Sequence, residues 1–146
     1  MKTYTIGFTQ KNAQRFFTLI KHNNVARIID IRLNNISQLA GFAKRDDLKY
    51  FLSELCDADY IYIKELTPTK DILNAYKKKE ISWDGYEDKF LNLMSQRNIE
   101  RTIDKSVIEN GCLLCSEHEP HYCHRRLVVE YLNQSWSTEI EVVHLI

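Results

Sequence analysis

Residues 112–126 read CLLCSEHEPHYCHRR and hold three of the four cysteines and three of the five histidines of this 146-residue chain. The apolar start of this stretch ends abruptly at Ser116, and a second apolar periodicity begins at Leu127. This pattern predicts a strand, a polar loop and a helix in succession. The loop is therefore expected between the carboxyl end of a strand and the amino end of a helix, where unpaired N–H groups and the helix dipole favour anions.

The rest of the chain continues the alternation of strands and helices. Short β-branched runs predict strands, and apolar residues at helical spacing predict helices, the first of them capped by Thr9. This order is typical of an α/β fold, and we expect one domain over residues 1–146, a sandwich with a mainly parallel sheet flanked by helices. A long loop is expected over residues 33–43. The strands are expected at residues 3–8, 25–31, 59–63, 112–115 and 140–145. The helices are expected at 13–20, 46–55, 67–76 and 86–94, with an interrupted helical region over 99–108, and a last helix is expected from the end of the polar loop to about residue 132.

The charge balance, the apolar runs and the cysteine spacing of the chain argue against several classes of protein. Twenty basic and twenty acidic residues cancel, so the overall charge does not indicate a nucleic-acid binder. The sequence contains no apolar run near the length of a membrane span and no signal-peptide pattern. Four unevenly spaced cysteines suit no disulfide framework. We therefore expect a soluble cytoplasmic protein without a membrane partner, whose thiols are free or bind metal.

The four cysteines fall into two groups. Cys56 ends an amphipathic stretch and Cys112 lies inside the expected strand, so both are expected to be packing residues. Cys115 and Cys123 flank the polar loop instead. Cys123 is expected near the amino end of a helix, beside His124, in surroundings that lower the pKa of a thiol.

Parallel strands bring their carboxyl ends together, even when these ends are far apart in sequence. Three such ends carry polar or unusual residues, and we expect them to converge. Asp30 closes a strand that reads as buried, and a buried carboxylate needs a partner, for which Arg32 or Arg125 is expected. The three converging segments are residues 7–9, 30–32 and 115–125.

These segments also carry a family resemblance. Residues 5–9 (TIGFT), Asp30-Ile31-Arg32, and above all the Cys-x-Glu at 115–117 followed by Cys-His-Arg at 123–125, resemble the family catalogued as domain of unknown function 488. The resemblance implies a small bacterial or archaeal α/β protein with a site but no established reaction. The chain departs from the family pattern at residues 8–9, where the family usually has His-Ser. It also departs over residues 33–41, which lack the basic and proline residues typical of the family. The positions carried over are Gly7, Asp30, Arg32, Cys115, Glu117, Cys123, His124 and Arg125.

The sequence predicts an anion- or phosphate-binding site at the strand carboxyl ends. The first of three hypotheses for it is an enzyme acting on a phosphate-bearing or other anionic substrate, with nucleotides and nucleic-acid ends as candidates. No resident cofactor or metal is expected for it. In such an enzyme the candidate residues would have three roles. Gly7, Thr9, Arg32 and Arg125 would bind the substrate, Asp30 or Glu117 would act as general acid or base, and Cys115 or Cys123 would be a nucleophile activated by His124 or by the arginines.

Two alternatives stay open. In the first, Cys112, Cys115, Cys123 and one of the histidines at 118, 121 or 124 bind zinc, although Cys112 and Cys115 should point to opposite faces of a strand. In the second, the protein is a non-catalytic module that binds a nucleotide or nucleic acid, with tyrosines available for stacking. Most tyrosines fall in periodic segments, which favours packing roles. The expected partner is a small molecule or nucleotide, nucleic acid is left open, and the sequence predicts no oligomeric state.

Overall fold

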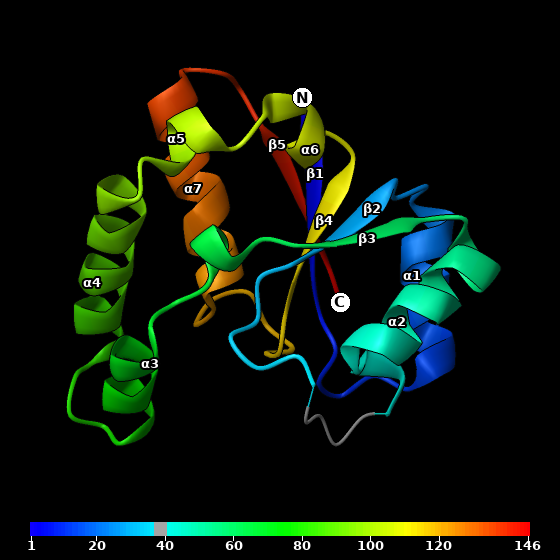
Figure 1. Ribbon diagram of the computed structural model, residues 1–146, viewed down its shortest axis with the longest axis horizontal. Coiled ribbons are helices and arrows are strands. Elements are labelled where there is room, and N and C mark those ends of the chain that lie inside the picture. The colour runs from blue at the N-terminus through cyan, green and yellow to red at the C-terminus, as the bar shows by residue number, and fades with distance from the viewer. Residues whose placement is uncertain (37–40) are drawn as a thin grey trace.

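The computed structural model describes residues 1–36 and 41–146, and Figure 1 shows a central sheet between two groups of helices. Its five strands are all parallel, in the order β3-β2-β4-β1-β5. The fold is therefore α/β, as expected, and the sheet is wholly rather than mainly parallel. The strands are β1 (Lys2–Gly7), β2 (Arg27–Asp30), β3 (Asp59–Tyr62), β4 (Gly111–Cys115) and β5 (Glu141–Leu145).

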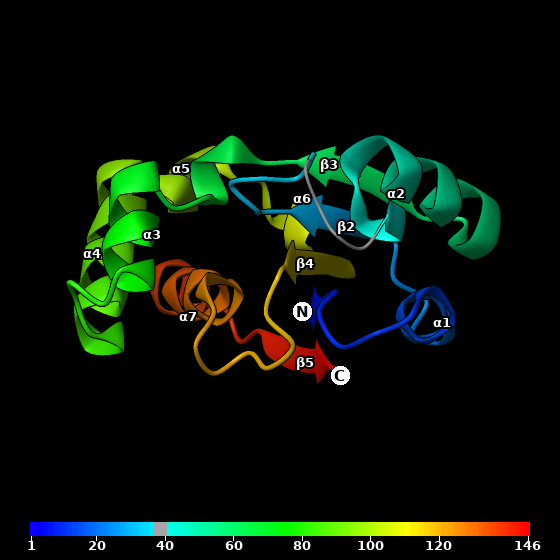
Figure 2. The same cartoon turned by 90° about the horizontal axis from the view of Figure 1, so that it is seen from below.

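Helices cover both faces of the sheet, with α1 and α2 on one side and α3, α4, α5 and α7 on the other (Figures 1 and 2). Each side has its own hydrophobic core. The helices are α1 (Ala13–His22), α2 (Arg45–Phe51), α3 (Lys70–Lys77), α4 (Trp83–Gln96), α5 (Ile99–Thr102), α6 (Lys105–Ile108) and α7 (His124–Trp136), with short 3₁₀ turns at Gly41–Ala43 and Lys64–Leu66.

Strand β4 contributes to both cores because its side chains alternate between the two faces of the sheet. Cys112 and Leu114 pack in the core under α1 and α2, whereas Leu113 packs in the core under α4 and α7. Cys112 is fully buried, which agrees with the packing role expected for it.

Two local expectations need correction. The residue that caps α1 is Asn12, whose side chain accepts a hydrogen bond from the Arg15 N–H at 2.8 Å. Thr9 lies before the cap, and its hydroxyl donates instead to the Ser116 carbonyl in the polar loop. The expected helix over 46–55 is also divided, because α2 continues as a π-helical segment, Leu52–Cys56.

The expected long loop over residues 33–43 is only partly described, since residues 37–40 lie outside the described residues. Residues 41–43 form the first 3₁₀ turn. Among the described residues, no helix combines the length and the apolar character needed to cross a membrane.

Candidate functional site

The carboxyl ends of three neighbouring strands meet at one edge of the sheet. Strand β4 lies between β2 and β1, so that Gly7 is level with Cys115 and Asp30 is level with Leu114. The expected convergence of the three segments is therefore present. Polar side chains from distant parts of the sequence become neighbours there because the strands run in the same direction.

Asp30 is fully buried and is surrounded by hydrogen-bond donors. Arg32 forms a two-pronged ion pair with it, with Nε and Nη2 each 2.9 Å from a carboxylate oxygen. The Tyr60 hydroxyl donates to Oδ2 at 2.5 Å and the Asn35 amide at 3.3 Å. Burial, followed by the hydrogen bond to Asp30, raises the pKa of Tyr60, which keeps the phenol protonated as a donor. Arg32 is thus the partner that the buried carboxylate required.

Arg32 is only 2 % exposed, yet its Nη1 has no hydrogen-bond partner among the described residues. The bidentate pair with Asp30 fixes the plane of the guanidinium, and the Phe8 ring packs over it at 5.5 Å. A buried N–H without an acceptor is costly in a folded protein. Arg32 therefore presents a fixed, positively charged donor that an anionic group can satisfy.

Arg125 is fully buried and holds the polar loop against the sheet. Its Nη1 donates to the Glu117 carbonyl and its Nη2 to the His118 carbonyl, the latter at 3.0 Å. Nε lies 3.3 Å from the Thr5 hydroxyl on β1. The loop passes so close to Gly7 that an added Cβ would overlap the Glu117 carbonyl. All these donors are directed at the protein, so Arg125 acts here as a structural clamp on the loop.

Cys115 and His124 form a buried pair at the start of α7. His124 Nε2 lies 2.7 Å from the Ile31 carbonyl, which can only accept, so Nε2 carries a proton. The other ring nitrogen, Nδ1, faces Cys115 Sγ at 3.5 Å. This arrangement of thiol, imidazole and orienting carbonyl is the pattern of an activated nucleophile.

The charges around this pair favour a thiolate on Cys115. Burial opposes ionisation, but the hydrogen bond from Cys123 and the positive charges of His124 and Arg125 hold the pKa of Cys115 well below its usual value. Burial and the neighbouring Cys115 raise the pKa of Cys123 well above the usual value, so this thiol stays protonated. Burial alone would lower the pKa of His124, but the Cys115 charge raises it.

The same three side chains can serve as metal ligands. The ligand atoms of Cys115, Cys123 and His124 all lie within 4.8 Å of one another. Two thiolates and one imidazole suit zinc with an open fourth position. Cys112 lies in the core on the other face of the sheet and takes no part. The four-ligand set considered from the sequence is therefore not assembled, but a three-ligand set is.

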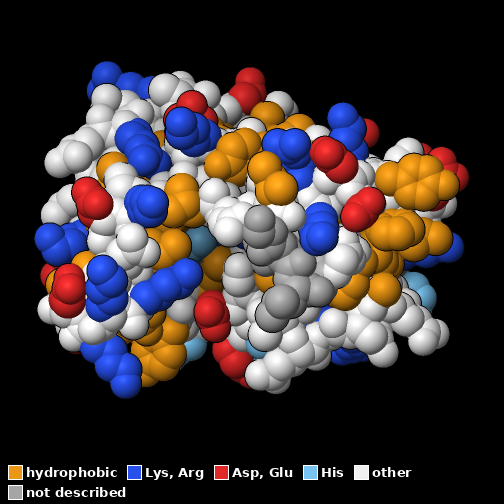
Figure 3. Space-filling model, turned by 60° about the horizontal axis from the view of Figure 1, so that its bottom comes forward, with side chains coloured by type: hydrophobic (Ala, Val, Ile, Leu, Met, Phe, Trp, Pro, Cys, Tyr) orange, Lys and Arg blue, Asp and Glu red, His pale blue; other side chains and the backbone are white. Residues whose placement is uncertain are grey.

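A cavity of about 290 Å³ opens beside these residues. Figure 3 brings this edge of the sheet forward and shows a hollow near its middle, with lysine and arginine side chains gathered on the side of α3. Polar and reactive side chains line one part of the cavity and aromatic rings another. The first group is Arg32, Cys115, Ser116, Glu117, Cys123 and His124, and the second is Tyr76, Trp83, Tyr86 and Tyr122.

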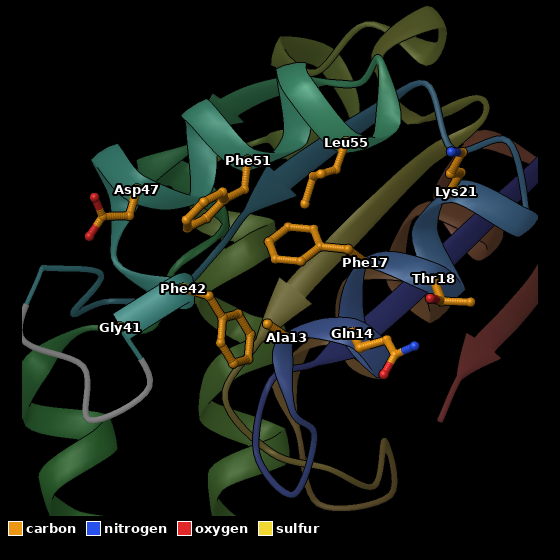
Figure 4. Close-up of a pocket in the computed structure, with 10 residues that line it drawn as sticks. All are labelled: Ala13, Gln14, Phe17, Thr18, Lys21, Gly41, Phe42, Asp47, Phe51 and Leu55. Atoms are coloured by element: carbon orange, nitrogen blue, oxygen red, sulfur yellow. The ribbon is translucent and has the colours of Figure 1, made fainter.

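A larger cavity of about 640 Å³ lies between α1 and α2, on the opposite side of the sheet. Figure 4 shows the rings of Phe17, Phe42 and Phe51 turned toward one another there, with the polar ends of Lys21 and Asp47 at the margin. The described lining holds no cysteine or histidine. Its size alone therefore does not make it the better candidate site, because the cysteine and histidine side chains line the smaller cavity instead.

The site residues expected from sequence occupy three positions relative to the smaller cavity. Five of them line it, namely Arg32, Cys115, Glu117, Cys123 and His124. Asp30, Arg125 and Gly7 lie behind them and support Arg32 or the loop. Thr9 binds the loop backbone.

Sequence reasoning missed the residues that complete the site. Asn35 and Tyr60 complete the shell around Asp30, and the aromatic side chains come from α3, α4 and the polar loop. The helical spacing of Tyr76 and Tyr86 indicated packing, and only the docking of α3 and α4 brings them to the cavity. No local motif marks them.

The family described as Domain of unknown function DUF488 matches residues 12–132. The chain belongs to this family. The DUF488 match covers every lining residue of the smaller cavity, together with Asp30 and Arg125, whereas Gly7 and Thr9 precede it. Comparisons with curated proteins and with solved structures found no match.

Phe8 stands where the resemblance to DUF488 proteins leads one to expect histidine. In this chain the Phe8 ring is nearly buried and packs over the Arg32 guanidinium. A phenyl ring transfers no proton, but it attracts a cation over its face and shields it from water. At this position the chain has an apolar support for Arg32.

Proposed function

We propose that this protein is a thiol-dependent enzyme that acts on a small anionic substrate at the carboxyl edge of the sheet. The observation that carries the proposal is one cavity lined both by the Cys115–His124 pair and by Arg32, whose buried Nη1 has no hydrogen-bond partner among the described residues. A nucleophile beside a fixed cation is the arrangement that group transfer from an anionic substrate requires.

The reaction proceeds by a covalent intermediate. The Cys115 thiolate forms a bond to the electrophilic atom of the substrate while the bond to the leaving group breaks, and His124 Nδ1–H gives its proton to that group. Water then attacks the intermediate, His124 takes up a proton, and the product leaves with a hydroxyl group as the thiolate returns. Charge and protons balance over the two steps.

The supporting residues have separate roles. Asp30 positions Arg32, because each of its carboxylate oxygens accepts a hydrogen bond from one guanidinium nitrogen. Glu117 is exposed at the cavity and is the carboxylate available to assist proton transfer there. Cys123 stays protonated and donates a hydrogen bond to the Cys115 thiolate.

We expect iodoacetamide to alkylate Cys115 about tenfold faster than Cys56 near neutral pH, because an ordinary thiol is only a few per cent ionised there. Cys56 is the more exposed of the two, and burial raises its pKa. The alkylation rate of Cys115 should stay constant as the pH falls below about 8.5, the pKa of a free thiol. It should decline only when the pH falls through the lowered pKa of Cys115. Peptide mass spectrometry of the labelled native protein measures both rates.

His124→Gln provides the control, since glutamine keeps a donor within reach of the Ile31 carbonyl but lacks the imidazole. The Cys115 rate should drop toward that of an ordinary thiol. Inorganic phosphate should protect Cys115 in the wild-type protein and not after Arg32→Met. A native protein in which Cys56 reacts first and Cys115 reacts only after unfolding would refute the thiol mechanism.

A zinc protein is the second candidate, favoured by the three clustered ligand atoms of Cys115, Cys123 and His124. The orienting bond from His124 Nε2 to a backbone carbonyl suits a metal ligand as well. Against it, Arg125 Nη1 lies 3.8 Å from Cys123 Sγ and repels a divalent cation. Elemental analysis of natively purified protein decides between them, since stoichiometric zinc would replace the thiol proposal.

A further inference from the structure

The cavity beside Cys115 has an aromatic wall, which we define as Tyr76, Trp83, Tyr86 and Tyr122. Trp83 is its centre. It stacks on Tyr86 with ring centroids 5.0 Å apart and contacts Tyr76 and Tyr122 edge-on at 5.5 Å each. Tyr86 is 2 % exposed and anchors the wall in the core, whereas Tyr122 is 56 % exposed. The wall is thus rigid at its base and open at its rim.

Core packing alone does not account for the exposed surface of this aromatic wall. Buried aromatic rings are ordinary core residues, but Trp83 and Tyr122 keep exposed surface within a cavity that also holds reactive side chains. Rings that face a polar, cation-bearing cavity offer a planar surface to a ligand. Bases stack on such rings in many nucleic-acid and nucleotide sites.

The opposite part of the cavity is suited to an anion. Arg32 cannot swing away, because Asp30 holds two of its nitrogens and Phe8 covers its face. Its remaining nitrogen, Nη1, has no partner among the described residues. Phosphate, like carboxylate, accepts strong charge-assisted hydrogen bonds from a guanidinium group, and Nη1 offers one such donor.

We infer that the cavity binds a nucleoside monophosphate, with its base against Trp83 and Tyr122 and its phosphate on Arg32. The phosphate site in this inference rests on the proposed function. The new element is the aromatic surface that binds the base. A volume of about 290 Å³ lies just below the usual range of ligand pockets, so it suits a single nucleotide rather than a polymer. The phosphate then lies next to Cys115 and His124, where the chemistry takes place.

The two tryptophans of the chain make the inference directly measurable. Trp136 lies at the end of α7, where its indole N–H donates to the Glu100 carbonyl at 2.7 Å. In Trp136→Phe, Trp83 is the sole tryptophan and reports on the cavity. We expect adenosine, guanosine, cytidine or uridine 5′-monophosphate to quench this fluorescence. The reciprocal Trp83→Phe variant should show no change at Trp136.

The affinities for a nucleotide, its nucleoside and inorganic phosphate measure the contributions of the base and of the phosphate separately. The best nucleoside monophosphate should bind at least tenfold more tightly than its nucleoside and than inorganic phosphate, since stacking and the ion pair both contribute. Arg32→Met should weaken the nucleotide about tenfold and leave the nucleoside unchanged. Calorimetry on the wild-type chain and on Trp83→Leu gives the same comparison if Trp136→Phe does not fold.

The outcomes distinguish this inference from the thiol proposal. All titrations are repeated on Cys115→Ser, because binding needs no reactive thiol. Equal affinity for phosphate and for every nucleotide would overturn the role of the aromatic wall and leave an anion-binding enzyme. Binding of a single-stranded oligonucleotide but of none of the four monophosphates would overturn the inference in favour of a nucleic-acid ligand.

Discussion

Gly7→Ala is expected to destabilise the protein by about 3 kcal/mol, the upper range for overpacking a closed site. A Cβ at Gly7 would overlap the Glu117 carbonyl and come within 2.7 Å of Arg125 Nη1. Neither neighbour can move cheaply, because Arg125 is fully buried and holds the loop through two carbonyls. The polar loop must move away from the sheet to make room for the added methyl group. Cys115 and His124 would then lose their alignment with each other.

Urea unfolding followed by circular dichroism measures this loss. Gly85→Ala is the matched control, since a Cβ there meets Ile81 at an ordinary 3.4 Å inside helix α4. Alanine in a helix is favoured over glycine, so the control should gain about 0.5–1 kcal/mol. If Gly7→Ala unfolds at the wild-type urea concentration, the loop does not pack on β1 as described.

Asp30→Asn is expected to cost about 3–5 kcal/mol, the effect of removing one partner from a buried ion pair. Asparagine keeps the shape of the side chain but not its charge. Arg32 would then remain buried with an unbalanced positive charge, and the Tyr60 hydroxyl would lose its carboxylate acceptor. The same variant should weaken the protection of Cys115 by phosphate, because Arg32 is no longer fixed.

Asp46→Asn is the control for charge removal as such. Asp46 pairs with Arg45 at 3.2 Å, but its side chain is 87 % exposed, and exposed pairs contribute about 0–1 kcal/mol. The two variants are compared by thermal and urea unfolding at the same pH. Similar small losses in both would show that Asp30 is not the anchor of the Arg32 cluster.

The edge of the sheet could be predicted from sequence because parallel strands leave little choice. Once β1, β2 and β4 are recognised as parallel strands, their carboxyl ends must lie at the same edge of the sheet. The observed order β2-β4-β1 then makes Gly7, Asp30 and Cys115 neighbours. The partner of Asp30 was also foreseeable, since a buried carboxylate requires a cation and Arg32 lies two residues away. These predictions rest on backbone geometry and electrostatics alone.

The remainder of the site depends on tertiary packing. Tyr60 and Asn35 reach Asp30 from a neighbouring strand and a loop, and nothing local marks them as its donors. Trp83 enters the cavity only because α4 packs against α7. The assignment of the helix cap to Thr9 was wrong for a similar reason: the chain crosses the polar loop before the helix begins, and Asn12 lies at the turn.

The strand order also fixes when the site can exist during synthesis. Strands β2 and β3 are close in sequence and can pair early, but β1 lies between β4 and β5, which emerge near the end of the chain. Strand β1 therefore waits unpaired until β4 and β5 have been made. Such long-range pairings fold slowly. Because Gly7 meets Cys115 only when β4 joins β1, the growing chain can assemble the cavity around Cys115 only after β4 and α7 have been made.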